Sequence, residues 1–365
     1  MRWRERAVVA WVKAIRGADE LAFQFKRRTG LLGPLEIHAY RGHGTTRLLL
    51  LKARVLERPG VIRASARDSA RRNLRNMVRR MMSDEVPYAR LVARFGEVEQ
   101  AAVADDEGFA DLRIALPQPL PDSPAWHEVE LELTWPPIPK QGPVRATGRV
   151  LVPGNASYAV VSDLDDTVIQ SGATRLWTML KTALLSNVHT RLPFEGVAAF
   201  YRALVSGPDG QGWNPIFYVS AGPWNLADLI EDFMDLHGIP RGPLFLRNWS
   251  PRTVKGGGRR HKLEIIDALM ETYPDLPFVL IGDSGEHDPE IYLEVVKAHP
   301  GRVLAIYIRD VTSGARKEAV DAIAAELVEH GVDLVHDDDT EAAALHARAN
   351  GLIAAGSDSQ AAANP

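Results

Sequence analysis

The 365-residue sequence has no cysteine and no long hydrophobic run. The lack of cysteine excludes disulfide bonds and thiolate metal sites. No stretch approaches the roughly 20 apolar residues of a membrane-spanning helix. The start of the chain is basic and then apolar, but Lys13 interrupts it and no small-residue cleavage site follows. The proportions of hydrophobic (45%) and charged (25%) residues are those of soluble globular proteins. We therefore expect a cytoplasmic chain of two domains without a cleaved signal peptide.

Positive charge is scarce outside the N-terminal part. Residues 1–80 carry 20 Lys and Arg against 6 Asp and Glu, a net charge of +14, so the remaining residues carry −18 to give −4 in total. This asymmetry predicts that the N-terminal part faces something anionic. Two predicted basic amphipathic helices, over residues 1–30 and Asp68–Glu85, suit an anionic phospholipid surface at the inner membrane face. Packing on the protein with solvated charges is the alternative, and nucleic acid is a less favoured partner.

Short strands with Gly and Pro between them are indicated from residue 31 to residue 155. Such a series predicts an all-β, sandwich-like domain. The expected extended segments are Leu35–Tyr40, Thr46–Leu56, Tyr88–Val98, Ala110–Leu116, Glu128–Trp135 and Val144–Val152.

Apolar strands alternate with helical patterns from residue 156 to residue 350, which predicts an α/β domain with a doubly wound parallel sheet. The expected strands are 158–163, 216–220, 244–246, 278–283, 303–308 and 333–336. The expected helices are 195–206, 225–237, 262–273, 289–298, 316–330 and 340–350. The chain from Ala354 is mostly Ala, Ser, Asp, Gln and Asn, so residues 351–365 are predicted to form a disordered tail.

Three carboxylates, Asp163, Asp165 and Asp166, follow the apolar run Tyr158–Val161. Acids gathered at the open end of a buried strand repel one another, and a divalent cation with oxygen ligands would offset that repulsion. An acidic turn that starts a helix is the alternative. The end of a sheet strand is where open α/β folds bind their ligands.

Three later segments extend this pattern. Ser220 ends the run Ile216–Gly222, Lys262 opens a predicted helix, and Asp283 ends the run Phe278–Asp283 and precedes Asp288. A Ser-Ala-Gly turn is also a common helix start, and Asp288 before a proline is also a helix N-cap. Any one of these segments alone would be a weak signal.

The four segments in this order resemble the motifs of the haloacid dehalogenase (HAD) superfamily: Asp163–Thr167, Ser220, Lys262 and Gly282-Asp283. More narrowly, Trp249-Ser250, His261-Lys262 and the stretch from Gly282 to Tyr292 resemble the actin-patch type of HAD phosphatidate phosphatase and its bacterial relatives. The resemblance covers about residues 156–312.

The resemblance implies an HAD-like fold and a role for each matching residue. Asp163 would be the nucleophile that forms an aspartyl-phosphate, and Asp165 the general acid and base. Lys262 would balance the charge of the nucleophile and the phosphoryl group. The phosphate would be bound by Ser220, Ala221 and Gly222, with Thr167 shaping the loop. Mg²⁺ would be held by Asp163, Asp165, Asp283 and, directly or through water, Asp288.

A glycine-rich basic loop over residues 255–261 precedes Lys262. Its Arg259 and Arg260 would grip a phosphate or a lipid headgroup; a solvated flexible loop is the alternative. Between the first two motifs, Gln170–Phe194 has room only for a short helix, so the site is expected to lack a large cap domain. An uncapped site suits a substrate that is presented on something large.

These observations predict a Mg²⁺-dependent phosphomonoester hydrolase, with phosphatidate at a membrane surface as the substrate that the resemblance implies. We expect no cofactor besides Mg²⁺. The alternatives are an HAD phosphatase for another phosphorylated protein, nucleic acid or metabolite, and a catalytically inactive membrane-surface adaptor. The full set of Asp163, Asp165, Ser220, Lys262 and Asp283 argues against an inactive protein.

Overall fold

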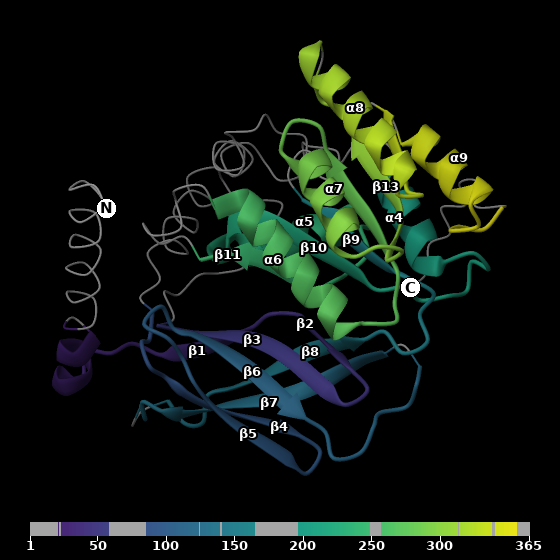
Figure 1. The fold of residues 1–365 in the computed structure, drawn as a ribbon. Coiled ribbons are helices and arrows are strands. Elements are labelled where there is room, and N and C mark those ends of the chain that lie inside the picture. The colour runs from purple at the N-terminus through teal and green to yellow at the C-terminus, as the bar shows by residue number, and fades with distance from the viewer. Residues whose placement is uncertain are drawn as a thin grey trace. The chain divides into compact units, whose positions relative to one another are not determined.

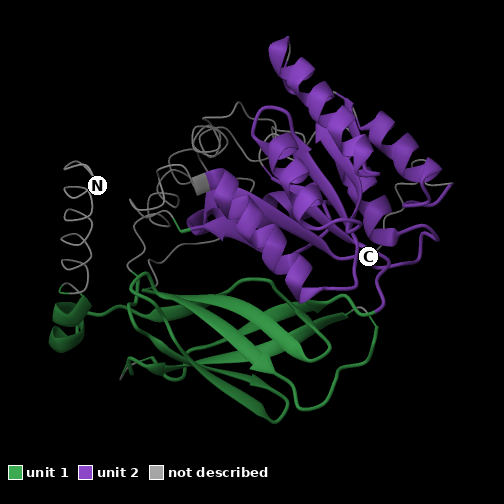
Figure 2. Ribbon diagram, viewed as in Figure 1, with its two compact units in different colours: residues 1–154, 248–257 green, residues 155–247, 258–365 purple. Residues whose placement is uncertain are grey.

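Two separate β-sheets organise the computed structural model, which describes residues 21, 23–57, 85–123, 125–138, 141–164, 196–248, 257–312, 314–337 and 340–355 (Figure 1). The chain divides into two units, Met1–Gly154 with Asn248–Gly257, and Asn155–Arg247 with Gly258–Pro365 (Figure 2). The predicted basic helix over Asp68–Glu85, apart from Glu85 itself, and most of the predicted helix over residues 1–30 lie outside the described residues. No helix in the described ranges is long and apolar enough to cross a membrane.

The first unit contains one eight-stranded sheet, in the order β1-β3-β2-β8-β7-β4-β5, with β6 also paired to β3. Its strands are β1 (Leu35–Ala39), β2 (Gly42–Thr45), β3 (Leu48–Glu57), β4 (Arg90–Phe95), β5 (Val98–Val103), β6 (Phe109–Ala115), β7 (Ala125–Trp135) and β8 (Arg145–Val152). Side chains from β3, β4, β6, β7 and β8 share one buried core. The predicted β content of this region is confirmed, and its sandwich-like arrangement stays a prediction.

The end of the predicted N-terminal helix packs on this sheet. Residues 23–29 are helical, Phe23 is buried against Trp135 with ring centroids 6.2 Å apart, and Lys26 forms an ion pair with Glu57 at 3.0 Å. The last turns of this helix therefore pack on the protein, which is one of the two alternatives given for it.

Two strands of the first unit were missing from the prediction. In β2, two glycines allow a close approach to β3, since a Cβ on Gly42 would lie 3.1 Å from Leu51 Cα. The predicted strand Tyr88–Val98 contains β4 and the turn at Gly96, which has a φ of +57°, and β5 begins only at its last residue and pairs with β4 as a hairpin. Most of β5 is exposed, so its sequence lacks the alternation that marks a half-buried strand.

The second unit contains a six-stranded sheet in the order β11-β10-β9-β12-β13-β14, and every neighbouring pair is parallel. The strands are β9 (Ala159–Asp163), β10 (Ile216–Pro223), β11 (Leu244–Arg247), β12 (Phe278–Asp283), β13 (Val303–Arg309) and β14 (Asp333–Asp337). Continuous apolar runs predict such strands because a parallel sheet is buried on both faces. All six predicted strands are confirmed.

Helices cover both faces of this sheet. They are α4 (Val197–Ser206), α5 (Ala227–Leu236, preceded by the 3₁₀ turn η2, Trp224–Leu226), α6 (Gly257–Thr272), α7 (Asp288–Ala298), α8 (Ala315–Glu329) and α9 (Glu341–Ala349). Apolar residues of α6, α7 and α8 share one buried cluster with β9, β12 and β13. On the opposite face, Tyr201 of α4 contacts Ser162 and Tyr218, and Phe200 packs edge-on against Tyr307.

Two predicted boundaries in this unit were wrong. Helix α6 begins at Gly257 rather than at Lys262, so Arg259 and Arg260 lie in a helix and not in a loop. The ion pair of Arg260 with Glu264, one turn further on, supports this first turn. The predicted tail cannot start at residue 351, because Leu352 and Ile353 are buried and Leu352 O accepts a hydrogen bond from the Tyr158 hydroxyl. Residues 356–365 lie outside the described chain.

Candidate functional site

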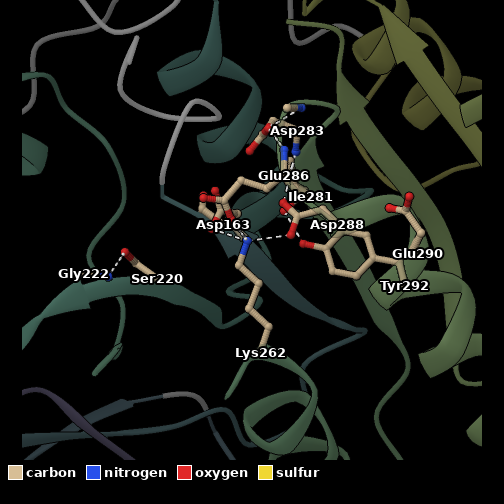
Figure 3. Close-up of polar contacts among 12 residues, drawn as sticks. Asp163, Ser220, Gly222, Lys262, Ile281, Asp283, Glu286, Asp288, Glu290 and Tyr292 are labelled. Carbon is tan, nitrogen blue, oxygen red and sulfur yellow. Dashed lines mark hydrogen bonds and ion pairs between the residues drawn. The ribbon is translucent and has the colours of Figure 1, made fainter. Parts of the chain in front are cut away.

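Three carboxylates meet at the carboxyl ends of two neighbouring strands. Ser162 of β9 is paired with Ile281 of β12, so Asp163, one residue further on, and Asp283, two residues further on, emerge at the same edge. Asp288 starts α7, directly after this edge. Asp163, Asp283 and Asp288 are all buried, and one oxygen of each lies within 4.8 Å of the others (Figure 3). The structure thus brings together three of the four predicted metal ligands.

Lys262 of α6 points into this acidic cluster. Its ammonium lies 2.8 Å from Asp163 Oδ1, 2.5 Å from Asp288 Oδ1 and 2.9 Å from Glu286 Oε2 (Figure 3). Lys262 is only 3% exposed. Three carboxylates thus contact one ammonium, and a fourth, Asp283, belongs to the same cluster. When all four acids are ionised, the site carries an excess of negative charge, which favours a dication.

The loop after β12 fixes the orientation of Asp283. The amides of Gly285 and Glu286 donate to Asp283 Oδ1 at 2.7 and 2.9 Å, and the amide of Asp283 donates to Asp288 Oδ2 at 3.2 Å. The other oxygen of Asp283, Oδ2, is buried and accepts no hydrogen bond from the described residues. Gly282 permits this packing, because a Cβ there would lie 2.8 Å from Asp288 Cγ.

The electrostatics of the site follow from burial and from like charges held close together. Burial and the neighbouring Asp288 raise the pKa of Asp283 to about 8, and burial also raises the pKa of Asp288. Burial alone would lower the pKa of Lys262, but Asp163, Asp288 and Glu286 outweigh it and raise that pKa well above its ordinary value. Lys262 therefore remains charged. Its single positive charge does not balance the negative charge of the acids, so a bound cation would stabilise the site.

Ser220 lies at the same edge, on the other side of β9. Val219 of β10 is in register with Asp163, so Ser220 extends just beyond that level. Ser220 is buried, and its hydroxyl oxygen accepts a hydrogen bond from the amide of Gly222 at 2.9 Å. The predicted phosphate-binding turn Ser220–Gly222 is therefore placed beside the predicted nucleophile.

The two predicted phosphate-binding arginines are engaged elsewhere in the described structure. Arg259 pairs with Glu294 of α7 at 2.8 Å, and Arg260 pairs with Glu264 at 2.6 Å, both on the exposed side of α6. Their contact with a phosphate stays a prediction. Asp165 and Thr167, like the short helix expected within Gln170–Phe194, lie outside the described residues.

Glu286 is a site residue to which the sequence analysis gave no role. It lies inside the stretch from Gly282 to Tyr292, and only the structure shows that its carboxylate contacts Lys262. Tyr292 was missed as well: its hydroxyl donates to Ile281 O at 2.7 Å and ties α7 to the end of β12. Their position within the motif was the only signal that could have indicated them.

The donor set fits a hard divalent cation. All three clustered acids offer oxygen ligands, Asp283 Oδ2 is buried without a hydrogen-bond donor in the described chain, and the local charge is negative. Mg²⁺ is typically bound by one or two carboxylates with additional waters. Both oxygens of Asp288 already accept bonds, from Lys262 and from the Asp283 amide, so Asp163 and Asp283 are the better direct ligands.

Comparison with known proteins finds similarity over part of the second unit. Residues 158–310 match the family model described as the catalytic domain of phosphatidate phosphatase APP1, and this stretch includes Asp163, Ser220, Lys262 and Asp283. The chain is similar to phosphatidate phosphatase APP1 of Saccharomyces cerevisiae, with 31% identity over 41% of this chain and 25% of that protein. An uncharacterized protein of Schizosaccharomyces pombe is 29% identical over 42% of this chain and 25% of its own length.

The chain therefore spans about a quarter of the length of these curated relatives. Among solved structures, a carbohydrate acetylesterase from Xanthomonas citri aligns with a TM-score of 0.27 and 10% identity, over 81% of this chain and 66% of that one.

Proposed function

We propose that the second unit is an HAD-like, Mg²⁺-dependent phosphomonoester hydrolase. The observation that carries the proposal is the buried cluster of Asp163, Asp283 and Asp288 with Lys262 in contact with two of them. Cation-binding acids beside a nucleophile candidate and a fixed ammonium suit phosphoryl transfer, in which negative charges must approach one another.

Asp163 and Asp283 would hold the Mg²⁺, with Asp165 contributing its backbone carbonyl and Asp288 acting directly or through water. When bound, this ion would offset the charge of the attacking carboxylate and of the phosphoryl oxygens. Lys262 would stay charged beside Asp163 and stabilise the charge on the transferring group. The Ser220 hydroxyl, whose oxygen accepts the Gly222 amide, would donate to a phosphate oxygen from the other side of β9, with the Ala221 amide beside it.

The proposed reaction has two steps. A carboxylate oxygen of Asp163 attacks phosphorus, the bond to the ester oxygen breaks, and Asp165 gives its proton to the leaving alkoxide. Asp165 then takes a proton from water, and this water oxygen attacks the phosphorus of the aspartyl-phosphate. The bond to Asp163 breaks, inorganic phosphate leaves, and both carboxyl groups return to their starting states.

Phosphatidate is the proposed substrate, supported by the similarity of residues 158–310 to the APP1 catalytic domain and by the name of the yeast relative. A lipid substrate requires contact with a membrane. The net charge of +14 over residues 1–80 supports a peripheral position on an anionic surface of the inner membrane face. Charge reversal at Arg71, Arg72 and Arg75 should then weaken sedimentation with anionic liposomes.

The experiment that tests this function is Mg²⁺-dependent phosphate release from phosphatidate in mixed micelles. Asp163→Asn should lower the rate by about a thousandfold or more, because it removes the nucleophile. Asp235→Asn is the matched control, since Asp235 pairs with Arg241 on the surface of the same unit and should be dispensable. Equal activity of the Asp163→Asn protein would contradict the mechanism.

Comparison of substrates separates the alternatives. Phosphatidate turnover that exceeds the turnover of soluble sugar phosphates and nucleotides supports a lipid substrate. Equal rates on soluble substrates, independent of the micelle surface, would indicate a phosphatase of another specificity. Absence of phosphate release from every ester, including a generic aryl phosphate, would favour the adaptor.

A further inference from the structure

Arg316 holds the loop that carries the acidic residues, although it lies beyond the stretch matched by the family model, which ends at residue 310. It belongs to the first turn of α8. Its Nε donates to Ser284 O at 2.7 Å and its Nη2 donates to Glu286 O at 2.6 Å. The same guanidinium makes a bidentate pair with Glu290 of α7, in which Nη2 lies 2.9 Å from Oε2. Arg316 thus joins α8 to both ends of the loop between β12 and α7.

One peptide unit links Arg316 to the proposed metal ligand Asp283. The carbonyl of Ser284 and the amide of Gly285 are the two ends of one planar peptide bond. Arg316 binds the carbonyl end, and the amide end donates to Asp283 Oδ1 at 2.7 Å. This arrangement occupies Oδ1 and leaves Oδ2 without a donor among the described residues. The guanidinium is therefore hydrogen-bonded to the same peptide that orients Asp283.

A second connection runs through Glu286. Its carbonyl accepts from Arg316, its amide donates to Asp283 Oδ1 at 2.9 Å, and its carboxylate pairs with Lys262. Glu290, which holds the guanidinium in place, lies two residues after Asp288 in the first turn of α7. Movement of Arg316 would therefore disturb Asp283, Glu286 and Asp288 together.

We propose that Arg316 is a positioning residue for cation binding, acting through the Ser284–Gly285 peptide and the Glu286 backbone. This inference rests on the proposed function, because it requires the acids to bind Mg²⁺. Residues that orient metal ligands from outside the coordination sphere commonly change metal affinity by about 10- to 100-fold when they are replaced. Lysine cannot replace arginine here, because it lacks the planar fork that binds two carbonyls and a carboxylate at once.

A purely structural role is the competing explanation, and Arg302 provides a matched control. Its Nη2 donates to three backbone carbonyls of the same unit, those of Met270, Tyr273 and Leu276, at 3.4, 2.6 and 2.9 Å. These carbonyls lie in the last turn of α6 and just after it, at the end that is remote from Lys262. Arg302→Lys should therefore destabilise the fold without altering the cation site.

The test is the increase in melting temperature on titration with Mg²⁺ alone, starting from chelator-treated full-length protein. Binding to the folded state raises the melting temperature, so the titration reports affinity without any catalysis. Arg316→Lys should raise the half-saturating Mg²⁺ concentration by about tenfold or more. Arg302→Lys should leave it unchanged within about twofold, even if its melting temperature without metal is lower.

Glu290→Gln provides a second variant, because it keeps the shape of the side chain and weakens the hold on the guanidinium; it should also raise the half-saturating concentration. If Arg316→Lys and Glu290→Gln both match Arg302→Lys, the inference is overturned while the metal site stands. If the unaltered protein shows no response to Mg²⁺, the proposed metal site fails and this inference fails with it.

Discussion

Replacement of Lys262 by methionine should destabilise the second unit far more than the loss of an ordinary lysine. Methionine fills a similar volume but leaves Asp163, Asp288 and Glu286 without the ammonium that lies 2.5–2.9 Å from each of them. Removal of one partner from a buried ionic cluster typically costs about 3–5 kcal/mol, because a buried charge is left uncompensated. For a unit of this size, that cost corresponds to a fall in melting temperature of about 6–20 °C.

Scanning calorimetry in the presence of a chelator measures this effect. The matched control is Lys297→Met, because Lys297 pairs with Glu326 at 2.5 Å on the surface, where it is 46% exposed. Surface pairs contribute about 0–1 kcal/mol, so this control should melt close to the unaltered protein. Added Mg²⁺ should recover part of the loss in Lys262→Met, since a cation offsets the same acids. If Lys262→Met melts no lower than Lys297→Met, the charge argument for the site is wrong.

Two further predictions concern the same acids. In chelator-treated protein, Asp283 should contribute a fall in the free energy of unfolding of roughly 1 kcal/mol for each pH unit between 3.8 and about 8, because the folded state keeps on Asp283 a proton that the unfolded chain has lost. Urea unfolding at several pH values checks this, and an Asp283→Asn protein with an unchanged slope would contradict it. Gly282→Ala should displace Asp288, since the new Cβ would lie 2.7 Å from Asp288 Cβ, and should weaken the Mg²⁺-dependent rise in melting temperature. Gly258→Ala is the control: its new Cβ meets open space in α6, so the Mg²⁺-dependent rise in melting temperature should be unchanged. Equal Mg²⁺ responses of these two variants would refute this role for Gly282.

Much of the second unit could be predicted from the sequence because its strands are buried on both faces. Strands of that kind are short continuous apolar runs, and the helices between them are amphipathic. Glycine was the main source of error. Gly257 and Gly258 resembled a loop but form the first turn of α6, and Gly42 and Gly44 concealed β2, where the backbones approach too closely for side chains.

The candidate site could be predicted to the extent that it lies at strand ends. Parallel strands place their carboxyl ends at one edge, so Asp163, Ser220 and Asp283 had to emerge together once the sheet was assumed. Arg316 carried no such signal. It reaches the loop after β12 only because α8 packs beside α7, and neither periodicity nor spacing specifies that contact.

The most direct test of the account is a crystal structure of the protein grown with Mn²⁺ in place of Mg²⁺, with the anomalous signal used to locate the ion. The account predicts one ion bound to a carboxylate oxygen of Asp163 and to Oδ2 of Asp283, with Lys262 still in contact with Asp163. An ion bound elsewhere, or no ion while Asp283 Oδ2 stays buried without a ligand, would contradict it.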